Sequence, residues 1–375
     1  MTATRQTPAV ERRRFAILLS LFLCTPLACA RAEAPGVRIL DLPFKVRALR
    51  GPRSEAAVSV ATSGLLPIAG AKAGPAAGNE ESAPIALIWG DDGGAVLSLT
   101  DGTVMVRPIG RDAVEGLTAA ETPRGALPGS RRVLAGALSA YLTGRARAPD
   151  GGDAAAVLTI RERQPMAVST DPKPVPVATV TVPAGGEAVF APLRPRLLRL
   201  AGHPALLAAT LSGAEAGGLV LIGRPDGQPA WGVMARTPPQ PGPPLKIAGI
   251  ADFAGSGGLQ AATVSARGLL QIWTLSPDTI EPAGEASGYA AGDGDADLAV
   301  TNPTAGPPEL VLPVAGRPEI ALLQAKGSLR ERLRIPLPAP ATTGIVALGE
   351  GAAARLLVGL ADGRVAVIAP DGGKP

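Results

Sequence analysis

The sequence predicts an all-β fold built from repeated antiparallel hairpins. Three observations support this prediction. The 47 glycines and 39 prolines interrupt the chain throughout, the segments between them are rich in Val, Ile and Leu at strand length, and one strand-turn-strand unit recurs. Aromatic residues make up only 3% of the chain, so we expect a core of small aliphatic side chains and alanine.

The first 32 residues have the pattern of a cleavable export signal. The basic stretch Arg12–Arg14 precedes the apolar run Phe15–Leu23, which is too short to span a bilayer comfortably. Small residues at Ala28, Ala30 and Ala32 provide the spacing that signal peptidase accepts. We therefore expect a mature chain, residues 33–375, that is periplasmic or secreted.

Other interpretations of this segment stay open. The stretch Pro26–Cys29 resembles a lipoprotein box, which would anchor the chain, and Arg12–Phe15 resembles a twin-arginine export signal. The two cysteines of the chain, Cys24 and Cys29, both lie here. The mature chain therefore lacks disulfides, thiolate nucleophiles and cysteine zinc sites.

The net charge of +4 comes from the same segment, which holds five arginines against the single acidic residue Glu11. The mature chain is neutral and has no cluster of Lys and Arg, so we expect no nucleic-acid partner. We expect instead a monomer that binds a protein or glycan in the cell envelope.

The hairpin unit occurs seven times. Its turns are predicted near Gly64, Gly102, Gln164, Gly218, Gly268, Gly316 and Gly363. The later copies are about fifty residues apart, the length of a four-stranded propeller blade. We therefore predict a single seven-bladed β-propeller over residues 33–375, with six or eight blades as alternatives because residues 103–163 are irregular.

Each copy supplies the two middle strands of a blade, and flanking segments supply the others. An inner strand precedes the copy, as in Leu245–Gly255, and an outer strand with alternating charge follows it, as in Ser328–Pro338. The chain ends before a last outer strand, so Val37–Leu49 is predicted to pair there and close the ring. Ala69–Pro84 is predicted to be a loop, and Arg236–Pro244 a stiff connection between blades.

Two repeat families resemble parts of this chain. Gly249–Trp273 and Ala291–Val300 resemble FG-GAP and VCBS propeller repeats, and Gly359–Gly372 is similar to the quinoprotein-type blade of bacterial outer-membrane-assembly proteins. The resemblance implies a seven-bladed propeller used for binding or scaffolding, with calcium as an occasional structural ion in the first class.

Asp293, Asp295 and Asp297 are the candidate calcium ligands, because they alternate like the acidic loop of those repeats. Calcium needs about six oxygen ligands, and the first two family positions are occupied here by Tyr289 and Ala291. The alternative is that this stretch is a loop entering the inner strand of a blade. No other cofactor is expected.

Other chemistry-bearing residues have structural alternatives. His203, the only histidine, is predicted to occupy a turn between strands. Asp91, Asp92, Asp252 and Asp293 would provide paired carboxylates for glycoside cleavage if their loops shared a rim. Trp89, Trp231 and Trp273 are predicted to pack between blades, with a sugar-stacking platform as the alternative.

Two functions from different classes follow. The first is an exported, non-catalytic β-propeller that acts as a binding or assembly scaffold in the bacterial cell envelope. The second is an exported hydrolase or lyase that acts on polysaccharide or phosphate esters through a carboxylate cluster at the channel. The second function requires at least three charged side chains that converge at one mouth of the channel.

Overall fold

A computed structural model of the chain describes residues 36–62, 85–165, 174–213, 216–225 and 230–371. All of them belong to one compact unit, Glu33–Pro375. The predicted export segment and the predicted loop Ala69–Pro84 lie outside the described residues. No helix in the described part of the chain is long and apolar enough to cross a membrane.

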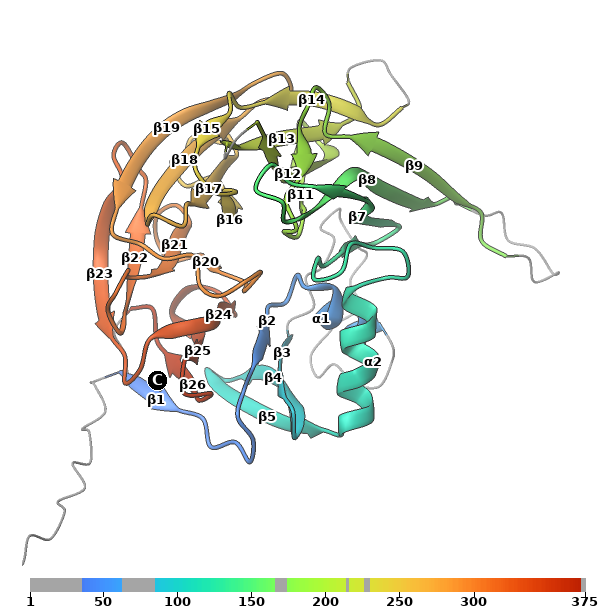
Figure 1. The fold of residues 1–375 in the computed structure, drawn as a ribbon. Coiled ribbons are helices and arrows are strands. Elements are labelled where there is room, and N and C mark those ends of the chain that lie inside the picture. The colour runs from blue at the N-terminus through green and yellow to red at the C-terminus, as the bar shows by residue number, and fades with distance from the viewer. Residues whose placement is uncertain (1–35, 63–84, 166–173, 214–215, 226–229, 372–375) are drawn as a thin grey trace, which may run out of the picture. The chain divides into compact units, whose positions relative to one another are not determined.

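The described chain is mostly β, and its strands form antiparallel sheets (Figure 1). Three four-stranded sheets use consecutive strands. The first contains β2 (Ala48–Arg50), β3 (Ile85–Gly90), β4 (Gly93–Thr100) and β5 (Thr103–Ile109). The second contains β16 (Lys246–Ala251), β17 (Gln260–Val264), β18 (Leu269–Leu275) and β19 (Ile280–Ser287). The third contains β20 (Ala299–Thr301), β21 (Glu309–Pro313), β22 (Glu319–Gln324) and β23 (Arg330–Pro336).

A larger sheet joins two groups of strands. The first group is β6 (Val133–Ala135), β7 (Leu138–Arg147), β8 (Asp153–Arg163) and β9 (Val177–Pro183). The second is β11 (Arg196–Leu200), β12 (His203–Ser212), β13 (Ala216–Gly223), β14 (Gly232–Arg236) and β15 (Gln240–Pro241). The short strand β10 (Val189–Phe190) pairs with both β8 and β12 and so connects the groups.

The last sheet combines the two ends of the described chain. It contains β24 (Ala341–Leu348), β25 (Arg355–Leu360), β26 (Val365–Ile368) and β1 (Val37–Ile39), with a 3-10 turn at Gly351–Ala353. The strand β1 pairs antiparallel with β26, so that Val37 lies opposite Ile368. The predicted pairing of the N-terminal segment is therefore present, but only its first part takes this role, because Ala48 and Leu49 belong to β2.

The core lies between successive sheets. Val311 and Leu322 of one sheet pack with Ile345 and Val358 of the last sheet, and that sheet packs in turn on the β2–β5 sheet. The β16–β19 sheet contacts β20–β23 on one side and the β11–β14 group on the other. These contacts stack the sheets face to face through small aliphatic side chains, as the low aromatic content predicts.

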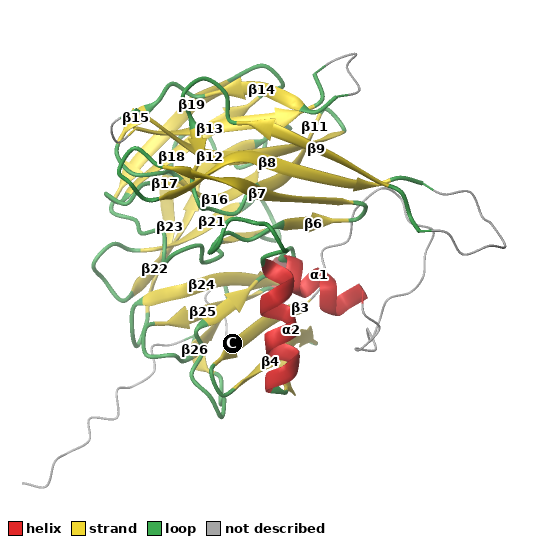
Figure 2. Ribbon diagram, turned by 45° about the vertical axis from the view of Figure 1, so that its right-hand side comes forward, coloured by secondary structure: helices red, strands yellow, loops and turns green. Residues whose placement is uncertain are grey.

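Two helices correct the all-β prediction. The helix α1 (Glu55–Thr62) occupies the first strand expected before Gly64, and α2 (Arg111–Glu121) lies in the irregular region. The hydroxyl oxygen of Ser54 accepts the Ala57 amide at 3.2 Å, which caps the start of the alanine-rich α1. Both helices pack on the β2–β5 sheet through a shared apolar cluster (Figure 2).

The hairpin predictions near Gly268, Gly316 and Gly363 are confirmed as turns between the second and third strands of their sheets. The Gly102 turn instead joins the third and fourth strands, β4 and β5. The corresponding middle hairpin turns at Asp91 and Asp92.

Three other turn predictions need correction or stay untested. Gln164 follows β8 and precedes β9, so it too lies after a third strand, and the middle hairpin of that group turns between β7 and β8. Gly218 lies inside β13, while β12 ends at Ser212. Gly64 lies outside the described residues.

Candidate functional site

Charged side chains from the starts of several first strands meet in one network. Arg131, Arg194 and Asp297 each lie two residues before β6, β11 and β20, which are the first strands of their groups. We use the term ionic network for these three residues together with Arg50, Glu55, Glu121 and Arg196. Residues far apart in the sequence are thus brought together because equivalent strand ends converge.

Arg131 is the central cation of the ionic network and is 5% exposed. Its Nε lies 2.7 Å from Glu55 Oε1 and 3.6 Å from Glu121 Oε1. Its Nη1 donates to Asp297 Oδ1 and to the Asp295 carbonyl, each at 3.1 Å. One guanidinium therefore connects both helices with the segment that leads into β20.

Asp297 is the central anion. Besides Arg131, its Oδ1 contacts Arg194 Nη1 at 3.4 Å and Arg196 Nη1 at 3.6 Å. Its Oδ2 accepts the backbone N–H of Gly51 at 3.2 Å. Both oxygens of this buried carboxylate are therefore occupied by donors from the protein.

The surrounding arginines control the protonation of the buried acids. Burial alone would raise the pKa of Asp297, but Arg131, Arg194 and Arg196 outweigh it and hold that pKa well below its ordinary value. Burial would likewise raise the pKa of Glu55, and Arg194 and Arg131 lower it. Both side chains are carboxylates at neutral pH.

Glu121 differs from these two acids. Burial raises the pKa of its carboxyl above the ordinary value, and the hydrogen bond and charge of Arg50, with Arg131, offset this only in part. Arg50 holds the carboxylate with two donors, Nε and Nη2, and its guanidinium also lies 5.1 Å from the centre of the Trp89 ring. Glu121 is therefore the acid of the network that takes up a proton most readily.

Lys246 lies beside the network at the start of β16. Its ammonium donates to the Gly294 carbonyl at 3.0 Å. Burial lowers the pKa of Lys246 to about 8, although Asp295 and Asp297 act in the opposite direction. The folded chain thus gives up this proton at a lower pH than the unfolded chain does.

This difference predicts that the free energy of unfolding rises between about pH 8 and pH 10.5, because the unfolded chain then binds more protons. Lys246→Met should remove that rise, which is at most about 3 kcal/mol. Urea unfolding at several pH values measures it. Lys326→Met, at an exposed lysine, is the control and should follow the wild type.

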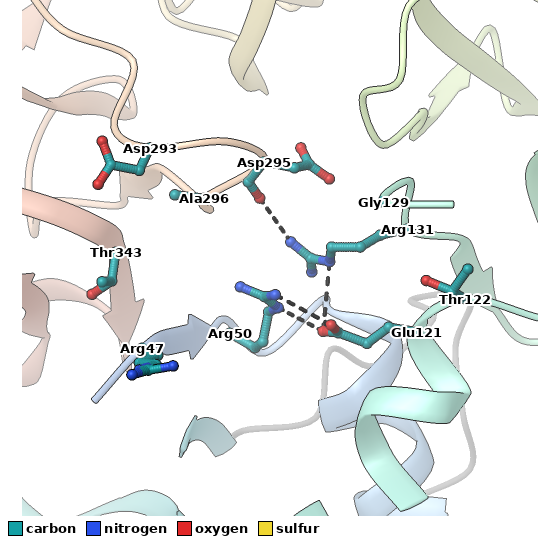
Figure 3. A pocket seen from close by; sticks show the side chains of 10 residues that line it. All are labelled: Arg47, Arg50, Glu121, Thr122, Gly129, Arg131, Asp293, Asp295, Ala296 and Thr343. Carbon is teal, nitrogen blue, oxygen red and sulfur yellow. Dashed lines mark hydrogen bonds and ion pairs between the residues drawn. The ribbon is translucent and has the colours of Figure 1, made fainter. Parts of the chain in front are cut away.

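A cavity of about 350 Å³ opens over the ionic network. Its lining consists of Arg47, Arg50, Glu121, Thr122, Gly129, Arg131, Asp293, Asp295, Ala296 and Thr343. In Figure 3, Arg50 and Arg131 converge on the Glu121 carboxylate, and Asp293 and Asp295 lie across from them on another segment. More than three charged side chains thus converge at one cavity, and the enzyme hypothesis requires such a convergence at one mouth of a central channel.

The three aspartates proposed as calcium ligands have different environments. Asp293 is exposed at the cavity, Asp295 accepts the backbone N–H of Arg194 at 3.2 Å, and Asp297 is enclosed by arginines. These three side chains do not form a suitable ligand set for a cation, because Asp297 already contacts three arginines. No group of three or more His, Cys, Asp or Glu side chains in the described part of the chain is placed to hold a metal ion. Thermal unfolding with calcium and with a chelator tests the prediction directly.

The alternative prediction, that the stretch with the three aspartates is a loop entering the first strand of a sheet, agrees with the structure. Residues 290–298 form a loop, and Ala299–Thr301 follows as β20, the first strand of its sheet. The sequence therefore located the loop that contributes Asp297 to the network. It did not indicate the arginines that surround this residue.

The other carboxylates proposed for glycoside cleavage do not gather. Asp91 is exposed and pairs with Arg47 at 2.7 Å. Asp252 accepts the amides of Ser256 and Gly257 and thereby holds its own loop. Of the four proposed residues, only Asp293 lines the cavity.

The single histidine and the tryptophans have structural positions. His203 is exposed at the start of β12, directly after a two-residue turn. Trp89, Trp231 and Trp273 are all buried, and the indole N–H of Trp273 donates to Thr263 Oγ1 at 2.9 Å. Packing between neighbouring strand groups is confirmed for Trp231 and Trp273, whereas Trp89 packs with the two helices on the β2–β5 sheet.

The stacked four-stranded antiparallel sheets give this protein a β-propeller-like fold. Similar solved structures include Trypanosoma rangeli sialidase in complex with sialic acid, at a TM-score of 0.40 and 10% identity, over 76% of this chain and 52% of that one. The same sialidase as a covalent intermediate with 2,3-difluorosialic acid has a TM-score of 0.41 and 9% identity, over 77% and 52%.

The chain thus spans about half the length of those sialidase chains. No protein-family model and no curated protein sequence matches it.

Proposed function

We propose that this chain is an exported β-propeller of six blades that acts, without catalysing a reaction, as a binding or assembly module in the bacterial cell envelope. The blade count rests on the sheets. Four sheets have four strands each, and the larger sheet divides into the β6–β9 group and a second group built around β11–β14. Pairing of β1 with β26 supports closure by the N-terminal strand.

The pairing of the central charges is the observation on which the non-catalytic role rests. Asp297 and Glu55 are held as carboxylates by arginines that are themselves buried. Such groups fix the relative positions of strand ends, and their burial against the arginines keeps them away from a substrate. The exposed part of the cavity, which includes Asp293 and Arg47, is left to contact a protein or glycan partner.

Binding to envelope proteins and purified envelope polysaccharide tests this proposal. The exported chain should retain a specific partner, and Asp293→Ala should weaken that binding about tenfold without loss of stability, since removing one charged hydrogen bond costs on this order. Asp278→Ala, at an exposed turn outside the cavity, is the matched control. Equal binding by both variants, or none by the wild type, would contradict the proposal.

One observation favours the hydrolase or lyase as a second candidate. Glu121, whose pKa is raised by burial, lines the cavity together with Asp293 and Asp295, so three carboxyl side chains share one site. Assays on envelope polysaccharides and phosphate esters decide between the two. Turnover that is lost in Glu121→Gln while binding is retained would replace the non-catalytic proposal.

A further inference from the structure

The strand β9 is an outer edge that differs from the other outer strands. The strands β1, β5, β14, β19 and β23 each contain at least one charged residue. Charges on edge strands oppose pairing with other chains. The seven residues of β9, VATVTVP, contain none. This edge therefore lacks the protection that the other outer strands have.

The side chains of β9 are also unusually exposed. All of its residues except Val182 are exposed, on both faces of the strand. Val175, Val177 and Val180 are among the few large apolar side chains in the described residues that are more than a third exposed. Figure 2 shows β8 and β9 running out together past the neighbouring strands, so a partner strand has access along this edge.

The backbone of β9 offers hydrogen-bonding groups on that side. The Gln164 amide donates to the Pro176 carbonyl. Because every second residue of an antiparallel strand bonds to its neighbour, the residues of β9 that bond to β8 are Ala178, Val180 and Val182. The N–H and C=O groups of Thr179 and Thr181 therefore point away from β8. No described strand pairs with β9 on this side.

The sequence of β9 is complementary to itself. In an antiparallel pair of two copies centred on Val180, Thr179 of each strand faces Thr181 of the other, and Ala178 faces Val182. Threonine thus meets threonine and small apolar residues meet each other, as cross-strand pairs favour. Thr179 and Thr181, whose backbone groups point away from β8, lie opposite each other in this pair. Their amides and carbonyls can therefore form hydrogen bonds in both directions. Because β9 has no charged residue, there is no charge repulsion between the two strands.

We infer that two copies of this chain associate through β9, forming a continuous sheet across a two-fold axis at Val180. The two β9 strands supply backbone hydrogen bonds, and the exposed valines around them supply apolar contact. This association replaces the monomer expected from composition and is independent of the cavity and of its partner.

Sedimentation of the full-length chain over a range of concentrations tests the dimer. The wild type should show a monomer–dimer equilibrium, and Val180→Lys should raise the dissociation constant about tenfold or more, because two like charges then lie directly opposite. Mixing Val180→Lys with Val180→Glu should restore association between the two variants. Met105→Lys, at the exposed centre of the edge strand β5, is the matched control and should dimerise like the wild type.

Crosslinking gives a second measurement. Val180→Cys should form a disulfide-linked dimer under oxidising conditions, because opposed residues at a non-hydrogen-bonded position lie within disulfide range. The wild type accounts for any crosslink through Cys24 or Cys29, and Met105→Cys should give no more than the wild type. A monomeric wild type at all concentrations, or a Val180→Lys dimer as stable as the wild type, would overturn the inference.

Discussion

Arg131→Met is expected to lower the free energy of unfolding by about 3–5 kcal/mol at neutral pH, the usual cost of breaking a buried ion pair from one side. Methionine fills much of the same space, but it leaves Glu55 and Asp297 without their shortest ion-pair contacts. Those carboxylates stay buried, and only Arg194 and Arg196 remain to balance them. Chemical denaturation followed by circular dichroism measures the change.

Arg47→Met is the matched control. The Arg47–Asp91 pair has a short contact of 2.7 Å, but its two side chains are 71% and 60% exposed. Exposed pairs contribute less than about 1 kcal/mol, so this variant should unfold nearly as the wild type does. If the two substitutions lowered the free energy of unfolding equally, burial of the ionic network would not determine how much its ion pairs stabilise the fold.

The hairpins of the later repeats could be predicted because their turns use local chemistry. The turns at Gly268, Gly316 and Gly363 adopt positive φ angles that glycine tolerates, and apolar runs flank them. The Asp91–Asp92 turn was missed because neither of its two turn residues is glycine, whereas the next turn, Asp101–Gly102, contains one. Glycine marks where a chain turns, but not which pair of strands in the sheet it joins.

The helix α1 was missed for a related reason. Val58 and Val60 favour a strand, and Gly64 follows at hairpin distance. The Ser54 cap and the alanines prevail because Ala56, Ala57 and Val60 are buried against the β2–β5 sheet. Tertiary packing thus decides between two local preferences of similar strength.

The ionic network could be predicted only in part. Asp297 was identified from the sequence, but as a candidate calcium ligand. Its true partners, Arg131 and Arg194, are separated from it by more than a hundred residues, and no local pattern connects them. A usable signal does exist in the repeat, since all three residues occupy the same position, two before a first strand. Aligning the blades by that strand, rather than by their glycine turns, would have placed these charges together.

Asp297 and Glu55 predict that the protein loses stability in acid. Both have a lower pKa in the folded chain than their ordinary values of 3.8 and 4.5. Their stabilisation is therefore complete above those values and is lost as the pH falls below them toward the folded pKa. Glu121, whose pKa is raised, acts in the opposite direction and offsets part of the loss.

The variant Asp297→Asn separates this effect from general acid unfolding. At pH 7 the substitution should lower the free energy of unfolding by about 3 kcal/mol or more, because three arginines lose their shared carboxylate. Below about pH 4 the difference in free energy of unfolding between variant and wild type should narrow, since only the wild type has a carboxylate there to protonate. Asp278→Asn, at an exposed turn, should follow the wild type throughout. A gap that stays constant from pH 7 to pH 3 would mean that the charge of Asp297 does not hold the network together, and that the arginines are positioned by the backbone alone.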